Sequence, residues 1–192
     1  FRNYLLLRDT DSDGMLEPST VTIIDLFSSN LSSLKGIEFF TELERLNCAA
    51  NQLIELDVSK NTKLQYLECH NNFLNNLDVS NNTELINLNC GSNNLSEIDI
   101  RNNIKLTELS CYYNQLVELD ISKNTLLSTI YCHNNQLKEL NLSNNSKLWL
   151  LDCYNNQLTE LDTFNNPNLY YIRGYGNEFT NLDFSKNSNL FS

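Results

Sequence analysis

The chain has 192 residues and a net charge of −11, from 24 acidic and 13 basic residues. This length suits one domain, and the acidic balance argues against nucleic acid or an anionic membrane surface as a partner. The sequence contains no apolar run of about 18 residues, so we expect no segment inserted in a membrane.

Residues 1–20 are predicted to form an N-terminal cap that contains an acidic loop, DTDSDGMLEPST. Its alternating aspartates and its glycine match positions of an EF-hand loop, in which carboxylates point at one calcium ion and the glycine makes a sharp turn. The last position departs from that pattern, because an EF-hand loop carries glutamate there. The alternative is an acidic turn without a metal ion. The candidate calcium ligands are Asp9, Asp11, Asp13, Met15 through its carbonyl, Glu17 and Thr20.

Residues 21–42 are predicted to form a degenerate first coil, and residues 43–189 seven repeats of 21 residues. Every gap between neighbouring cysteines is 21 residues, and two asparagine rows keep the same period. A fixed period of this kind indicates a solenoid of stacked coils. Residues 190–192 begin a further repeat, so we expect the natural protein to be longer. The rows are Cys48, Cys69, Cys90, Cys111, Cys132 and Cys153; Asn51, Asn72, Asn93, Asn114, Asn135, Asn156 and Asn177; and Asn61, Asn82, Asn103, Asn124, Asn145, Asn166 and Asn187.

The repeat reads L-x-x-L-x-C-x-x-N-x-L-x-x-L-D-V-S-x-N-x-x, as in LQYLECHNNFLNNLDVSNNTE from residue 64. Its first eleven positions resemble the consensus segment of leucine-rich repeats. The 21-residue form is similar to a variety found in secreted and surface proteins of bacteria, in which a calcium loop often precedes the repeats. The resemblance implies a curved right-handed solenoid. Its concave side would carry a parallel β-sheet, and its convex side short strands or irregular structure.

The repeated positions are expected to fill the interior. Stacked cysteines have parallel side chains, so we expect buried free thiols rather than disulfides or metal ligands. The asparagines are expected to form two internal ladders that pair backbone groups at the corners. In the last repeat Gly174 replaces cysteine, and we expect Phe184, pointing inward from the opposite wall, to fill the lost volume. A third row of acids, beginning at Asp57, is interpreted as solvated, with a calcium-binding ladder as the alternative.

Function is expected on positions that the repeat does not specify. Seven of the nine tyrosines lie from Tyr112 onward, and several fall in columns beside the inward-facing leucine and cysteine. Tyrosine is enriched at binding hot spots, although it is also a favourable strand residue. The candidate partner-binding residues are Tyr66, His70, Tyr112, Tyr131, His133, Tyr154, Tyr171 and Tyr175.

The sequence therefore predicts a secreted or cell-surface bacterial module that binds a protein partner, for adhesion or host interaction, through its concave face. A glycan bound by the same tyrosines and a purely structural spacer are the alternatives. We expect no enzyme activity, since no serine elbow, Walker loop or zinc motif is present. We also expect the protein to be a monomer. Calcium in the N-terminal loop is the one cofactor considered.

Overall fold

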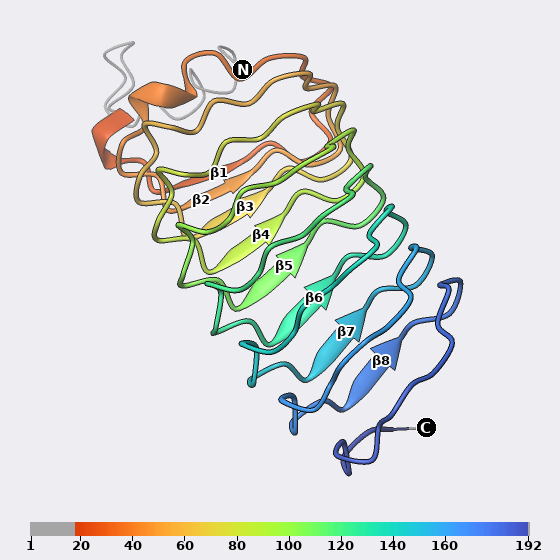
Figure 1. Ribbon diagram of the computed structural model, residues 1–192. Coiled ribbons are helices and arrows are strands. Elements are labelled where there is room, and N and C mark those ends of the chain that lie inside the picture. The colour runs from red at the N-terminus through yellow and green to blue at the C-terminus, as the bar shows by residue number, and fades with distance from the viewer. Residues whose placement is uncertain (1–17, 192) are drawn as a thin grey trace.

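The computed structural model describes residues 18–191, which form one solenoid of stacked coils (Figure 1). Two short 3₁₀-helices, η1 (Pro18–Thr20) and η2 (Ile37–Phe39), lie in its first coils. Each coil contributes one strand of three residues. The strands are β1 (Ile23–Asp25), β2 (Arg45–Asn47), β3 (Tyr66–Glu68), β4 (Asn87–Asn89), β5 (Glu108–Ser110), β6 (Thr129–Tyr131), β7 (Leu150–Asp152) and β8 (Tyr171–Arg173).

The eight strands form one parallel sheet in chain order. From β2 onward the register advances by one repeat per strand, so that Tyr66 pairs with Asn87, 21 positions later. Between β1 and β2 it advances by 22, since Ile23 pairs with Arg45. The first coil therefore holds one residue more than a regular coil, although it joins the same sheet.

The interior is built from ladders of like residues. The central residue of each strand from β1 to β7 is buried, as Leu67 and Leu109 are. The residue two positions later is buried as well, and it is a cysteine after β2 to β7 and Leu26 after β1. All six thiols are free and buried, as predicted. Burial raises the pKa of Cys48 to about 12 and that of Cys90 to the same value. The thiols therefore remain protonated and act as small apolar side chains.

The first asparagine ladder pairs the backbone where the chain leaves the sheet. The Nδ2 atom of Asn72 donates to the carbonyls of Cys48 and Cys69 at 3.0 and 3.1 Å. Its Oδ1 atom accepts the N–H of Leu53 at 2.9 Å. Each asparagine thus joins its own coil to the preceding one, and the pattern recurs from Asn51 to Asn177. The predicted ladder is confirmed.

The second ladder lies at another corner and is also confirmed. The Nδ2 atom of Asn82 donates to the carbonyls of Val58 and Asn61 at 3.0 and 2.9 Å. Its Oδ1 atom is buried without a hydrogen-bond donor, and the same holds for five further members of the row. Six of the seven members therefore use only half of the amide, whereas Oδ1 of Asn187 accepts from Oγ1 of Thr163 at 2.7 Å. The first ladder uses both halves.

The side opposite the sheet is irregular, and no strand forms there among residues 18–191. Near the C-terminal end, the ring that fills the space beside Gly174 is Phe179. A Cβ atom on Gly174 would lie 3.2 Å from Cε2 of Phe179 and 3.9 Å from Sγ of Cys153. The expected compensation therefore comes from Phe179, which is half-buried as Phe184 also is.

Candidate functional site

The surface that faces away from the core along the strands is called here the sheet face. In each coil the two strand residues that flank the buried central one point to this side, as the burial pattern of β3 shows. The residue after the cysteine continues the same alternation. These positions form three columns along the sheet. In the coil of β3 their members are Tyr66, Glu68 and His70. All eight candidate binding residues belong to them.

Four of these residues form a continuous stack of rings, the aromatic ridge: Tyr112, His133, Tyr154 and Tyr175. The ring centroids of Tyr112 and His133 are 5.0 Å apart with planes 6° apart. His133 and Tyr154 are 4.4 Å apart, and Tyr154 and Tyr175 are 4.6 Å apart, each pair with planes 11° apart. These distances approximate the spacing of neighbouring strands, about 4.8 Å. One ring per coil therefore stacks without displacing the backbone.

The ridge begins over a glycine. A Cβ atom on Gly91 would lie 2.6 Å from Cζ of Tyr112 and less than 3 Å from two further ring atoms. The ring of Tyr112 thus covers the position that a side chain at residue 91 would occupy. Because Gly91 has no positive φ, its role here is to leave space, not to permit an unusual backbone conformation.

A buried carboxylate lies beneath the ridge. The side chain of Asp152 is completely buried, and its Oδ2 atom accepts a hydrogen bond from the Arg173 guanidinium. The same atom lies 3.5 Å from Nδ1 of His133. Arg173 in turn lies 5.4 Å from the Tyr154 ring centroid and 5.7 Å from that of Tyr171. Asp152 and Arg173 therefore connect the ridge to the floor of the sheet face, which is formed by the two columns that lie within the strands.

Burial influences the ionisation of this cluster. It lowers the pKa of His133, an effect that the charge of Asp152 opposes. Burial raises the pKa of Asp152, while the charges of His133 and Arg173 oppose that shift. Burial thus favours the uncharged form of His133, in which the ridge presents ring edges and hydroxyl groups without a formal charge of its own.

The remaining candidates lie outside the stack. The guanidinium of Arg45 lies 3.9 Å from the Tyr66 ring centroid, and Nδ1 of His70 lies 3.2 Å from a carboxylate oxygen of Glu68. Tyr66 and His70 are separated from the ridge by the coil of Gly91. Tyr131 and Tyr171 stand on the floor of the sheet face, both half-buried. The structure thus groups four of the eight predicted residues in direct contact.

The predicted calcium ligands Asp9, Asp11, Asp13, Met15 and Glu17 lie outside the described residues. Thr20 ends η1 and is exposed. Within residues 18–191 no group of three acidic, histidine or cysteine side chains is arranged to hold a metal ion. Calcium binding by the loop remains a prediction, and calorimetric titration of the chain with calcium tests it.

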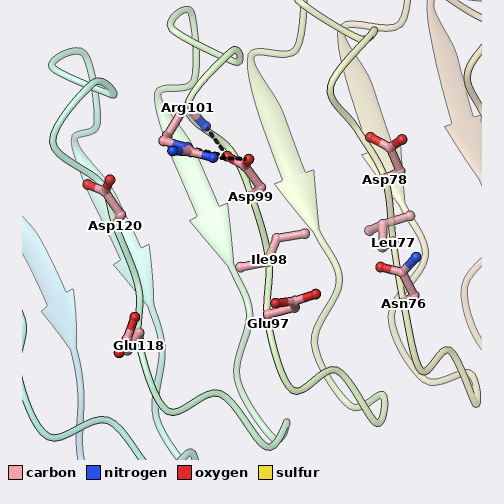
Figure 2. Close-up of a pocket in the computed structure, with 9 residues that line it drawn as sticks. All are labelled: Asn76, Leu77, Asp78, Glu97, Ile98, Asp99, Arg101, Glu118 and Asp120. Atoms are coloured by element: carbon pink, nitrogen blue, oxygen red, sulfur yellow. Dashed lines mark hydrogen bonds and ion pairs between the residues drawn. The ribbon is translucent and has the colours of Figure 1, made fainter.

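The row of acids that begins at Asp57 lies on the surface opposite the sheet, as Figure 2 shows for Asp78, Asp99 and Asp120. These side chains line a shallow groove of about 560 Å³ together with Glu97 and Glu118. Each aspartate accepts the backbone N–H two residues ahead, for example Ser80 to Asp78 at 2.9 Å. Hydrogen bonds from Ser80 lower the pKa of Asp78. The row is exposed, as predicted, and stabilises turns.

Sequence reasoning left a second line of aromatic residues without a role. Trp149 and Tyr170 directly precede β7 and β8, and Phe191 has the same repeat position after β8. The three residues are 44%, 46% and 67% exposed. The rings of Tyr170 and Phe191 stack with centroids 5.9 Å apart. Their common spacing of 21 residues was the signal in the sequence. They lie at the strand-entry edge of the sheet, whereas the ridge lies at the exit edge.

Comparisons with known proteins decide what this architecture is. The functional domain of InlJ from Listeria monocytogenes, described as including a cysteine ladder, shares 33% identity at a TM-score of 0.55, over 90% of this chain and 48% of that one. Internalin C2 of the same species shares 24% identity at a TM-score of 0.78, over 91% and 80%. This chain has the leucine-rich repeat fold.

A leucine-rich repeat protein of Leptospira interrogans has the same fold, with a TM-score of 0.77 and 23% identity over 83% of this chain and 44% of that one. This chain spans about half the length of the InlJ domain and of the Leptospira protein. No protein-family model matches the chain, and no curated protein matches it. Among residues 18–191, no helix has the length and apolarity to cross a membrane.

Proposed function

We propose that this leucine-rich repeat solenoid is a protein-interaction module of a secreted or surface-exposed bacterial protein, and that it binds its partner through the sheet face. The aromatic ridge carries the proposal. Buried tyrosine surface is a common source of binding energy at interfaces. The similarity to bacterial internalins supports the cellular setting.

The arrangement of the rings favours a protein over a glycan. A sugar stacks on the open face of an aromatic ring. The faces of His133 and Tyr154, however, are covered on both sides by neighbouring rings of the ridge. The ridge therefore presents edges and hydroxyl groups, which suit the carbonyl oxygens and polar side chains of a protein surface. The second line, with exposed Trp149, leaves glycan binding as the alternative function.

A structural spacer has no need of this ridge. Because only a glycine fits beneath Tyr112, the stack depends on an arrangement in two adjacent coils. The sheet would form equally well with small polar residues in this column. The ridge therefore supports a role in partner contact over that of a spacer.

The test compares two variants of the purified module on extracts of candidate host or bacterial surface proteins and on a glycan array. One variant replaces Tyr112, His133 and Tyr154 by serine. The control is Phe164→Ser, which removes an exposed aromatic from the opposite surface and restores the serine found at this repeat position in most coils. We expect the triple variant alone to lose a protein partner. Retained binding of the protein partner by the triple variant would exclude the ridge. A glycan signal that both variants keep, without any protein partner, would favour the alternative.

A further inference from the structure

A residue beside the ridge has an unusual backbone conformation. In every coil the residue before the first-ladder asparagine has a positive φ, as at Asn71, Asn134 and Gly176. The other occupants are the small or polar residues Ala50, Ser92 and Asn155. Tyr113, at φ 48°, is the one aromatic residue in this position among the described coils.

This conformation is unfavourable for a bulky side chain. Glycine adopts it freely and asparagine at low cost, but a large residue in the left-handed region is strained. Burial does not offset the strain at Tyr113, because 54% of the residue is exposed. Strained residues of this kind concentrate at functional sites. The fold itself therefore gives no reason for a tyrosine here.

The ring of Tyr113 belongs spatially to the ridge. Its centroid lies 6.1 Å from that of Tyr112 and 5.6 Å from that of His133, with planes at 83° and 84° to theirs. Tyr113 thus stands beside the first two rings of the stack and at right angles to them. Among residues 18–191, no ring stacks face to face on it, in contrast to His133.

Charge indicates what this ring could contact. The faces of aromatic rings attract cations, and the sheet face already pairs Arg45 with Tyr66 and Arg173 with Tyr171. These arginines, near the two ends of the sheet, are the only lysine or arginine residues in the three columns. In the central coils, therefore, the three columns contain no lysine or arginine that could pair with the ring of Tyr113. The net charge of −11 also attracts a basic partner over longer distances.

We propose that Tyr113 is a partner-binding residue whose ring receives a lysine or arginine side chain from a basic segment of the partner. This inference rests on the proposed function of the sheet face, and it names the chemistry of the partner. The strained backbone then has a reason, since it directs an aromatic ring outward at a position where other coils have a small residue.

The probes are linear peptides selected from a random phage-displayed library on the wild-type module, followed by synthesis of the strongest binders. We expect the selected peptides to be enriched in arginine and lysine over the unselected library. Anisotropy measurements then compare the wild type with Tyr113→Asn, Tyr113→Phe and Phe164→Ser. We expect about a 3- to 10-fold weaker affinity for Tyr113→Asn. Tyr113→Phe and Phe164→Ser are expected to bind as the wild type does, since the first keeps the ring.

Tyr113→Asn is also expected to shift the urea midpoint to a higher concentration, because asparagine relieves the strain. Peptides without basic enrichment, unchanged affinity of Tyr113→Asn, or a lower urea midpoint would each overturn the inference. The ridge variant with Tyr112, His133 and Tyr154 replaced by serine separates the two proposals. If it loses the peptides while Tyr113→Asn keeps them, only this inference fails. If both variants keep them, the proposed function of the ridge fails.

Discussion

Replacing Asn114 by alanine tests how the first asparagine ladder stabilises the solenoid. Its Nδ2 atom donates to the carbonyls of Cys90 and Cys111 at 3.1 Å and to that of Tyr112 at 3.2 Å. Its Oδ1 atom accepts the N–H of Leu95 at 2.9 Å. The substitution removes all four hydrogen bonds, but their loss does not have equal consequences.

The three carbonyls retain other donors after the substitution. Cys90 also accepts from Asn93 at 3.0 Å, and Cys111 from Asn135 at the same distance. The backbone N–H of Ser92 still donates to Tyr112. Only the N–H of Leu95 is left buried and unpaired, which costs about 1–3 kcal/mol. The three carbonyls also lose one of their donors each, which adds a smaller cost. Together, we expect Asn114→Ala to lower the free energy of unfolding by about 2–3 kcal/mol.

The second ladder provides the matched comparison, Asn103→Ala. The Nδ2 atom of Asn103 donates to the carbonyls of Val79 and Asn82, which also accept backbone N–H groups. Its Oδ1 atom has no donor. Removing this side chain leaves no backbone group unpaired, so the cavity dominates the loss, at about 1 kcal/mol.

Urea unfolding followed by circular dichroism measures both variants, with exposed Asn76→Ala as a control expected within about 0.5 kcal/mol of the wild type. For a chain of this size the expected loss at Asn114 lowers Tm by roughly 4–12 °C. If Asn103→Ala proved as destabilising as Asn114→Ala, the argument that unpaired donors determine the cost would be wrong.

Three further changes test the ridge and the core. Gly91→Ala should displace the ring of Tyr112, which a Cβ would approach to 2.6 Å, and weaken partner binding, while circular dichroism shows an intact fold. Arg173→Ala should leave the buried carboxylate of Asp152 without a charged partner and cost about 1–2 kcal/mol at neutral pH, less than for a fully buried pair because the Arg173 side chain is 43% exposed. Because the pKa of Asp152 rises further in this variant, its deficit should shrink as the pH falls and the carboxyl takes up a proton; a constant deficit would contradict the assignment. The six buried thiols should react with a thiol reagent only after unfolding. Since their folded pKa values lie above the ordinary value of 9.0, stability should fall as the pH rises above about 9, by up to about 1.4 kcal/mol per thiol and pH unit.

The repeated features of this fold could be predicted from the sequence, because each was observed several times. The same residue type every 21 positions identified the cysteines as core residues and the asparagines as corner residues, and the structure confirms both. The unequal pairing of the two ladders could not be predicted. It depends on whether a backbone N–H of the preceding coil points at Oδ1, as Leu53 does for Asn72.

Features that occur in a single coil were harder to anticipate. The sequence placed Gly91 and Tyr112 in one column, but not the ring of Tyr112 above the glycine. It also placed Asp152 on an outward column, whereas the structure buries this carboxylate beneath Arg173 and His133. Side-chain rotamers and ion pairs between neighbouring coils decide these outcomes, and a repeat pattern contains no information about them.

The spacing of the solenoid also bears on how well the ridge can bind. Parallel strands impose a separation of about 4.8 Å between coils, and rings stacked at 4.4 to 5.0 Å fit that separation without adjustment. The rings are therefore held by one another and by the sheet before a partner arrives. Binding then requires little further loss of side-chain freedom, which commonly costs about 0.5–1.5 kcal/mol per ordered side chain. Tyr113 lies outside this stack, so we expect it to provide contact chemistry while the ridge provides rigidity.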